Sequence, residues 1–236
     1  MTTKHIDVRS AHARGQTDLG WLQSRHSFSF GGYQDPSRMG YRSLRVINDD
    51  RVAPGGGFGE HGHRDMEIIS WVLDGALQHR DSTGTRGEIV PGDVQVMSAG
   101  SGIRHSEMNA SSTEPVHFLQ IWIEPARTGL KPQYAQRSFD PAGRRNAWQL
   151  VVSPDGRLNS IHVQQDANLS IAELQSGQSL PVTLDDHRHG YLHVATGEVD
   201  IDGVHLLAGD AVTFADQTSA SIAAHAESQI LLFDLG

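Results

Sequence analysis

The sequence predicts an all-β protein made of two antiparallel β-barrel or jelly-roll domains. Short runs rich in Val, Ile, Leu and aromatic residues alternate with turn residues, and no helical period is sustained. Glycine is abundant, with 25 among 236 residues, as expected for a chain with many tight turns. One pattern of strand and turn also occurs twice. Many short strands at this spacing indicate a sandwich or barrel.

Eight segments have the composition of β-strands. They are residues 41–48, 67–73, 93–98, 116–123, 161–165, 170–174, 190–195 and 229–234. Dipeptides that favour turns separate them: Asp74-Gly75, Thr83-Gly84, Pro91-Gly92, Thr196-Gly197, Asp202-Gly203 and Ala208-Gly209. Residues 10–22 and 39–42 are expected to form short helical or irregular pieces.

The repeated pattern predicts two copies of one module. Residues 67–75 resemble 189–197, and the turn and strand start at 91–94 resemble 208–212. Between the copies, residues 124–145 contain three prolines and several glycines, as a surface linker does. We expect an amino-terminal domain at 1–130 and a carboxy-terminal domain at 131–236.

Bulk composition excludes several classes of protein. Without cysteine, the chain has no disulfide, iron–sulfur cluster or thiolate zinc site, and histidine and carboxylates remain as metal ligands. The net charge is −9 and only two of the 19 basic residues are lysines, so direct nucleic-acid binding is not expected. No apolar run is long enough for a membrane helix, and the first residues lack a signal-peptide core. These features predict a cytoplasmic protein.

Two pairs of potential metal ligands dominate the sequence. His61 and His63 form one pair, and His105 and Glu107 form another; both have the i, i+2 spacing that places side chains on one face of a strand. One such pair alone is equally consistent with surface or hydrogen-bonded core residues. If strand pairing brings both together, three imidazoles and one carboxylate would surround a divalent transition metal and leave coordination positions open.

The repeat also predicts that the carboxy-terminal domain lacks this site. Aligning the two copies places Thr183, Asp185, Ile222 and Ala224 opposite the four candidate ligands, and only the aspartate is a ligand type. His187 and His189 form another H-x-H pair, but four residues out of register. We expect exposed or hydrogen-bonded loop histidines there, with a second metal site as the alternative.

These residues resemble the cupin superfamily. Its first motif is met at Gly55, His61, His63 and Glu67, with Gly75 one residue late, and its second at Gly102, His105 and Asn109. Gly100 stands where the second motif has a proline. The resemblance implies that the two barrels form a bicupin.

More narrowly, the chain resembles the pirin family of bicupins along nearly its whole length. The matching stretches are residues 26–30, 35–36, 44–49, 61–67, 97–107, 120–123 and 231–235. The resemblance implies quercetin 2,3-dioxygenase activity, as in similar bacterial members.

The resemblance to pirins also implies that Glu107, rather than Glu67, is the fourth ligand, and that the metal is Fe²⁺. The sequence alone leaves manganese, nickel, copper and zinc open. Glu67 would then support a ligand histidine through a hydrogen bond, or lie at the edge of the core.

A dioxygenase needs a flavonol, O₂ and a proton acceptor. We expect the flavonol to bind through its 3-hydroxyl and Glu107 to accept the proton. The candidate walls of an aromatic cleft, with Phe58 favoured first, are Phe28, Phe30, Phe58, Met66, Trp71, Met97, Met108, Phe118 and Trp122. Two alternatives remain: a metal- or redox-responsive regulatory protein with a protein partner, and a non-oxidative enzyme such as an isomerase.

Overall fold

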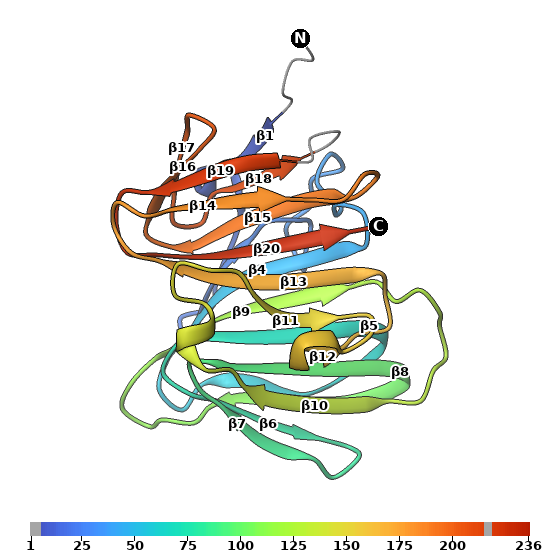
Figure 1. Cartoon of the computed structure of the whole chain (residues 1–236). Helices are drawn as coiled ribbons and strands as arrows, with labels where there is room; N and C mark the ends of the chain where they lie inside the picture. Colours follow the sequence, from blue (N-terminus) through green and yellow to red (C-terminus); the bar gives the residue numbers. More distant parts are fainter. Residues whose placement is uncertain (1–5, 215–218) are drawn as a thin grey trace. The chain divides into compact units, whose positions relative to one another are not determined.

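The computed structural model describes residues 6–214 and 219–236, and the regular secondary structure of this part of the chain is almost entirely β-strand (Figure 1). Residues 1–5, on which the expectation of no signal peptide partly rests, lie outside the described residues. The chain divides into two compact units. The amino-terminal unit contains Gly15–Phe139 and Val163–Gln165, and the carboxy-terminal unit contains Met1–Arg14, Asp140–His162 and Asp166–Gly236.

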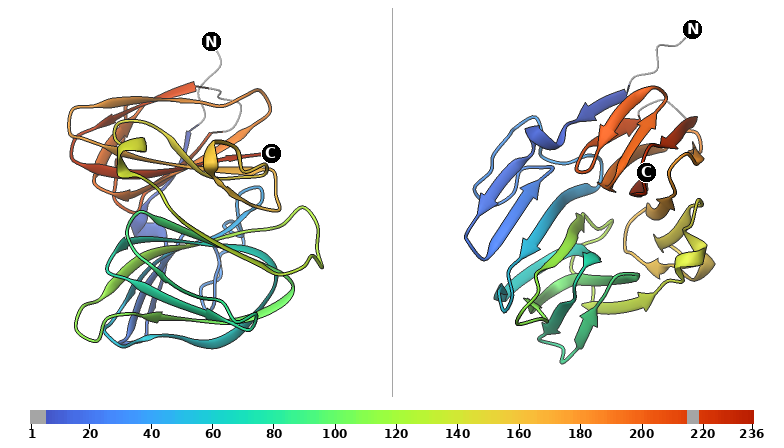
Figure 2. Two further views of the ribbon diagram at one scale, coloured as in Figure 1. Left: turned by 60° about the horizontal axis from the view of Figure 1, so that its bottom comes forward. Right: turned by 90° about the vertical axis from the view of Figure 1, so that its left-hand side faces the viewer.

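The amino-terminal unit is one curled antiparallel sheet (Figure 2). Its strand order is β2-β3-β4-β9-β5-β8-β6-β7, and β10 also pairs with β8. In chain order the strands are β2 (Gly15–Asp18), β3 (Leu22–His26), β4 (Leu44–Val52), β5 (Gly57–Asp74), β6 (Leu77–Asp81), β7 (Arg86–Ile89), β8 (Asp93–Asn109), β9 (Val116–Ile123) and β10 (Gln133–Ser138).

The carboxy-terminal unit has two sheets with the orders β1-β18-β15-β20-β13-β11-β12 and β14-β19-β16-β17. Its strands are β1 (Ile6–Arg9), β11 (Gln149–Ser153), β12 (Ile161–His162), β13 (Ala167–Leu174), β14 (Ser179–Thr183), β15 (His189–Thr196), β16 (Glu198–Ile201), β17 (Val204–Leu207), β18 (Ala211–Phe214), β19 (Ser219–Ala224) and β20 (Ser228–Leu235). Their alternating apolar residues fill one core, which includes Leu192, Val212, Ile222 and Ile230. Three single-turn 3₁₀ helices complete the described fold: η1 (Ala11–Ala13), η2 (Pro141–Gly143) and η3 (Arg157–Asn159).

Strand pairing sets the limits of both units. β10 forms a six-residue ladder with β8, so the amino-terminal unit continues past residue 130, where the sequence placed the boundary, to Phe139. β1 pairs with β18, so the first strand of the chain belongs to the carboxy-terminal unit. Such pairing between distant segments leaves no mark on local composition.

The internal repeat is present in the turns as well as in the strands. β5 ends before Gly75 and β15 ends before Gly197, and both glycines have positive φ, 79° and 88°. Gly92 precedes β8 and Gly209 precedes β18, again with positive φ, 96° and 88°. Glycine reaches this backbone region at little cost, so the recurring glycines mark matched turns of two similar modules.

All eight predicted strand segments overlap observed strands, although 161–165 contributes only the two residues of β12. β5 and β8 are longer than predicted, with 18 and 17 residues. Their additional halves are rich in glycine and polar residues and include the candidate ligands. Residues 10–22 contain a 3₁₀ turn and two strand segments, and 39–42 are irregular.

Antiparallel pairing of β5 with β8 positions the candidate site. His61 and His105 are directly opposite each other, and His63 is opposite Ile103. The register shifts between Phe58 and His61, and again after His63. Such irregularities re-aim side chains and often occur beside functional sites.

Gly75→Ala should destabilise the protein more than Gly84→Ala. Both glycines have positive φ, so each alanine costs about 1–2 kcal/mol of backbone strain. A Cβ at position 75 would also lie 2.6 Å from the carbonyl oxygen of Pro115, whereas one at position 84 meets nothing within 4 Å. Denaturant titration of both variants measures the difference. Equal losses of the free energy of unfolding would show that the turn at Gly75 tolerates a side chain.

Candidate metal centre

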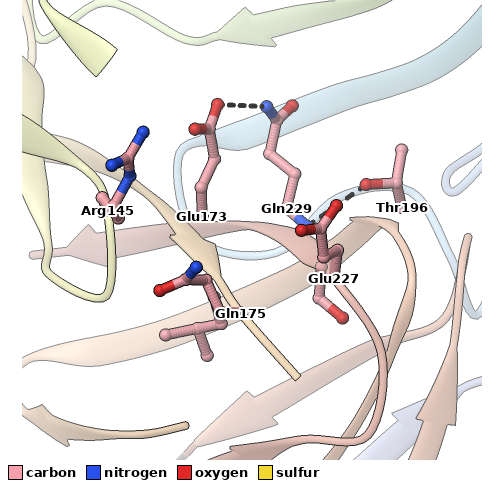
Figure 3. Close-up of a pocket in the computed structure, with 8 residues that line it drawn as sticks. Arg145, Glu173, Gln175, Thr196, Glu227 and Gln229 are labelled. Carbon is pink, nitrogen blue, oxygen red and sulfur yellow. Dashed lines mark hydrogen bonds between the residues drawn. The ribbon is translucent and has the colours of Figure 1, made fainter. Parts of the chain in front are cut away.

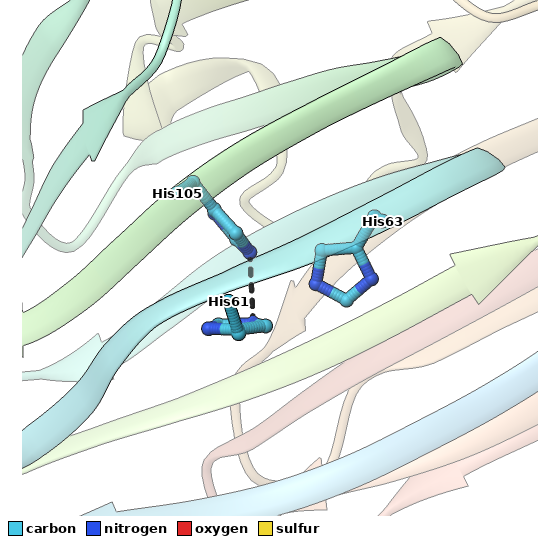
Figure 4. Close-up of side chains that lie close together, drawn as sticks. All are labelled: His61, His63 and His105. Atoms are coloured by element: carbon cyan, nitrogen blue, oxygen red, sulfur yellow. Dashed lines mark hydrogen bonds between the residues drawn. The ribbon is translucent and has the colours of Figure 1, made fainter.

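Three imidazoles converge on the inner face of the amino-terminal unit (Figure 4). His61 and His63 come from β5 and His105 comes from β8. The ring centroids are 4.5 Å apart for His61 and His105, and 4.8 Å apart for each of the other two pairs. One candidate ligand atom from each ring lies within 4.8 Å of the others. The structure therefore brings together the three histidines that the sequence singled out.

Hydrogen bonding leaves the Nε2 lone pair of His61 free for a ligand. Nδ1 of His61 lies 2.8 Å from the carbonyl oxygen of Gly59, which can only accept, so Nδ1 carries the proton. Nε2 of the same ring then faces Nε2 of His105 at 3.1 Å (Figure 4).

A second hydrogen-bond chain orients His105. Oδ2 of Asp81 lies 3.2 Å from Nε2 of His79, and Nδ1 of His79 lies 3.5 Å from Nδ1 of His105. The Asp81 carboxylate accepts a hydrogen bond from His79 Nε2–H, so in neutral His79 the other ring nitrogen accepts a hydrogen bond from His105 Nδ1–H. Nε2 of His105 is then also unprotonated and turned toward His61. This carboxylate–histidine–histidine chain resembles the outer hydrogen bonds that fix metal-binding imidazoles.

Sequence reasoning missed His79 and Asp81. They lie on β6, directly opposite Glu107 and His105 of β8, and their side chains are fully buried. Burial alone raises the pKa of Asp81, but hydrogen bonds from Thr83, His79 and backbone amides together lower it. The signal was the same i, i+2 spacing, here between a histidine and an aspartate next to the Thr83-Gly84 turn.

Burial keeps two histidines of the cluster, His63 and His105, unprotonated. Desolvation, followed by the neighbouring His61, lowers the pKa of His63 to about 4. Desolvation and the nearby histidines lower the pKa of His105 to about 2. Both rings are thus neutral at neutral pH, which is the form that binds metal ions.

The cluster fits a divalent transition metal. Two nitrogens held at about 2.1 Å from one ion, at right angles, are about 3.0 Å apart. The Nε2 atoms of His61 and His105 are 3.1 Å apart. Without a cation or proton between them, two lone pairs that face each other at this distance repel. Imidazole nitrogens suit zinc, copper, iron and nickel.

Glu107 is buried and is held by two hydrogen bonds away from the three histidines' group of ligand atoms. Its carboxylate accepts hydrogen bonds from Gln120 Nε2 at 2.6 Å and from Ser70 Oγ at 3.3 Å. Its oxygens do not join the group of ligand atoms that are mutually within 4.8 Å. Complete burial raises the pKa of Glu107, although Gln120, His79 and His61 oppose that rise. A cation at the histidines would stabilise the charged carboxylate.

Glu67 has a different environment from the one expected of a ligand-supporting residue. It accepts hydrogen bonds from Ser98 Oγ at 2.8 Å and from the backbone amide of Gln164 at 3.2 Å. It is 1% exposed, and burial raises its pKa. These contacts tie β5 to the short segment Val163–Gln165, so the structure assigns Glu67 to packing at the edge of the core.

A cleft of about 320 Å³ opens onto His61 and His63. Phe30, Phe58 and Trp122 form its aromatic walls, and Trp122 packs edge-on against His63 at 4.9 Å. Phe58, the favoured wall residue, therefore lines the cleft. Four other candidates, Phe28, Trp71, Met97 and Phe118, are buried in the core.

Asp50 is a cleft residue that the sequence did not reveal. It lies on β4, is 2% exposed, and shares the cleft lining with polar side chains that include Ser24, Asn48 and Gln120. Desolvation raises the pKa of Asp50 to about 7, against the hydrogen bond from Ser24. A carboxyl group that titrates near neutral pH inside a cleft is typical of functional sites. Asp50 follows Asn48 and Asp49 in the sequence, and no ligand-like spacing there identifies it as a site residue.

The carboxy-terminal unit has a different chemistry at the matched positions. Ile222 and Ala224 are part of its apolar core. His187 is exposed in a turn, and neither it nor His189 joins a cluster of ligand atoms among the described residues.

A larger polar pocket, of about 510 Å³, lies in the same unit (Figure 3). Glu173, Glu227 and Arg145 line it, and Gln229 Nε2 donates to Glu173 at 3.1 Å. It lacks histidines and an aromatic wall, so the cleft beside the histidine cluster is the better candidate for a functional site.

The fold and the cluster define a bicupin with a histidine centre in its amino-terminal barrel. The Pirin family matches residues 7–123, and a quercetinase C-terminal cupin domain matches residues 150–235. The chain is 45% identical to quercetin 2,3-dioxygenase of Escherichia coli K12, covering 98% of each sequence. It is 40% identical to a putative quercetin 2,3-dioxygenase of Pseudomonas aeruginosa, covering 98% and 99%.

Solved structures agree with these relationships. The crystal structure of YhhW from Escherichia coli superposes with a TM-score of 0.94 at 45% identity, covering 98% of each chain. The structure of bacterial pirin YhhW in complex with nickel(II) gives 0.93 at 44% identity, covering 98% and 99%. The chain belongs to the pirin family, and its relatives named quercetin 2,3-dioxygenase are oxidoreductases.

Asp50→Asn should flatten the pH dependence of stability in the metal-free protein. In the folded state the pKa of Asp50 is about 7, whereas an aspartate free in water has a pKa near 3.8. Because the pKa of Asp50 is higher in the folded state, its protonated form contributes stability at low pH. Between about pH 3.8 and pH 7 the free energy of unfolding falls as pH rises, by about 1.4 kcal/mol per pH unit. Asparagine is neutral at every pH, as the protonated aspartic acid is, so the Asp50→Asn protein does not lose this stability as pH rises.

Thermal unfolding of wild type and Asp50→Asn between pH 4 and pH 8 measures the effect, with the exposed Asp74→Asn as the matched control. The account predicts that Asp50→Asn gains stability over wild type as pH rises, while Asp74→Asn follows wild type. Parallel curves for all three proteins would show that Asp50 ionises normally.

Proposed function

We propose that this chain is a metal-dependent dioxygenase that cleaves flavonols such as quercetin. His61, His63, His105 and Glu107 would hold the metal, and Fe²⁺ is the proposed ion. The observation that supports this most strongly is the convergence of three imidazoles at a cleft with aromatic walls. The names of the curated relatives support the same activity and substrate class.

The metal would supply Lewis acidity and a template for the flavonol and O₂. Manganese, nickel, copper and zinc remain alternatives because the affinity of such a site for divalent ions does not select iron. The nickel complex of a related pirin is consistent with this tolerance.

The cleft suits a flat aromatic substrate. Phe30, Phe58 and Trp122 offer ring faces and edges to the fused rings of a flavonol and exclude water from them. Asp50, Asn48 and Gln120 provide hydrogen-bonding groups for hydroxyls. Because His61 and His63 line the same cleft, a substrate hydroxyl can approach the histidine cluster from this side.

Glu107 is the proposed acceptor for the proton of the flavonol 3-hydroxyl. Gln120 and Ser70 hold its carboxylate, and Gln120 also lines the cleft. Burial raises the pKa of Glu107, as a general base requires. Glu107→Gln would keep the shape of the side chain while removing its basicity.

Loss of the histidine cluster should abolish both metal binding at this centre and flavonol oxidation. In His61→Ala or His105→Ala, a ligand nitrogen of the cluster is gone, whereas His187→Ala removes only an exposed turn residue. Each protein is reconstituted anaerobically with Fe²⁺, its bound iron is quantified, and oxygen uptake and flavonol absorbance are followed after quercetin is added.

Wild type and His187→Ala should bind the same amount of iron and consume oxygen with quercetin, whereas the cluster variants should bind one iron fewer per chain and consume no oxygen. Iron loss in His187→Ala would overturn the site assignment. Wild type that binds the metal but does not consume oxygen with any common divalent ion would exclude dioxygenation of this substrate. That result would instead favour the alternative that the chain is a metal- or redox-responsive regulatory protein.

The His79 chain should tune metal affinity without providing a ligand. His79→Leu removes the acceptor for His105 Nδ1–H, and loss of such an outer partner typically costs 10–100-fold in affinity. His79→Asn places an oxygen near the lost nitrogen and should restore part of the affinity. Competition against a chromophoric chelator measures both. Equal affinities for the two variants would show that His79 acts only through packing.

A further inference from the structure

A second cluster of metal-ligand side chains lies in the carboxy-terminal unit. Asp200 is on β16, His205 is on β17, and His225 is in the turn after β19 (Figure 1). Asp200 and His205 are directly opposite each other across the hairpin. β19 pairs with the other edge of β16, and the amide of His225 donates to the carbonyl of Glu198 at 2.9 Å. Strand pairing therefore fixes all three positions.

The side chains of this cluster already point at one another. Oδ1 of Asp200 lies 2.8 Å from Nδ1 of His205, and Oδ2 lies 3.0 Å from Nε2 of His225. One ligand atom from each of the three residues lies within 4.8 Å of the others. Separations of about 3 Å are those of two ligands on one transition-metal ion. A metal could replace these hydrogen bonds with little movement of the side chains.

We propose that Asp200, His205 and His225 bind a divalent transition metal such as zinc or nickel. Two imidazoles and one carboxylate suit these ions, and water can complete the coordination because both histidines are exposed. The carboxylate also reduces the charge of the ion by one. The site is separate from the histidine cluster of the amino-terminal unit and does not depend on the proposed dioxygenase activity.

Glu198 provides the outer contact that metal-binding histidines usually have. Its Oε1 lies 3.4 Å from Nε2 of His205, the ring nitrogen that does not face Asp200. A carboxylate there fixes the ring with Nδ1 turned toward the metal position. Hydrogen bonds from His225 and His205 lower the pKa of Asp200, so its carboxylate is ionised as a ligand must be.

This cluster does not occupy the positions of the carboxy-terminal unit that the repeat matches to the amino-terminal ligands, where no metal site is expected. Val199 and Ile201, the neighbours of Asp200 along β16, are buried in the apolar core. Asp200 therefore points to the opposite, outer face of the strand. The sequence pattern does not reveal this cluster because its members are not spaced as H-x-H and come from three separate segments. Metal binding would join β16, β17 and the turn before β20.

The test uses a His61→Ala/His105→Ala background, so that the amino-terminal cluster does not contribute. Each protein is dialysed against Zn²⁺ or Ni²⁺, and bound metal is quantified by mass spectrometry. The background protein should bind one ion per chain, and adding His225→Ala or Asp200→Asn should reduce this to none. His162→Ala, an exposed histidine on β12, is the matched control and should leave the ion bound.

Thermal unfolding provides a second measurement. Zn²⁺ should raise the unfolding temperature of the background protein, and this rise should disappear in the His225→Ala and Asp200→Asn versions. Circular dichroism without metal should be the same for the background protein and for the versions that add His225→Ala or Asp200→Asn, because Asp200 and His225 are not part of the core. Absence of a bound ion in the background protein, or retention of the ion in both variants, would overturn the proposal.

Discussion

The pairing of β5 with β8 is the constraint on which the rest of the site depends. It places His61 directly opposite His105, and the pleat then turns His63 to the same face. A shift of one residue in either strand would send these side chains to the other face of the sheet. The apolar halves of both strands are fully buried and oppose such a slip. The ordinary core of the barrel therefore fixes the position of the candidate metal ligands.

Several electrostatic interactions in the metal-free site are unfavourable, and a bound cation would relieve them. Burial disfavours the charged forms of Glu107 and Asp50 and keeps His63 and His105 neutral. Hydrogen bonds from His61 Nδ1 to the carbonyl oxygen of Gly59 and from His105 Nδ1 to His79 turn the unprotonated Nε2 atoms of His61 and His105 toward each other. The metal-free arrangement therefore favours the binding of a cation between these groups. The same low-polarity environment suits an aromatic substrate.

Local spacing was sufficient to find the centre of the site but not its surroundings. The i, i+2 pairs predicted the three clustered histidines, and the turn glycines predicted the repeat. The contacts of Glu67, the chain from Asp81 through His79, and the position of Asp50 all depend on pairing between strands distant in sequence. The same limit applies to the unit boundaries, because β10 and β1 join sheets far from their neighbours in sequence. The glycine-rich halves of β5 and β8 become strands only because each has a partner.

Anomalous diffraction from crystals of the nickel-loaded protein tests the central claim most directly. Data collected on either side of the nickel absorption edge locate the ion without reference to activity. The account predicts an anomalous peak within bonding distance of Nε2 of His61 and Nε2 of His105, with His63 as a third ligand. A fully loaded protein with no peak between those rings, or with coordination through Nδ1 of His61, would contradict it.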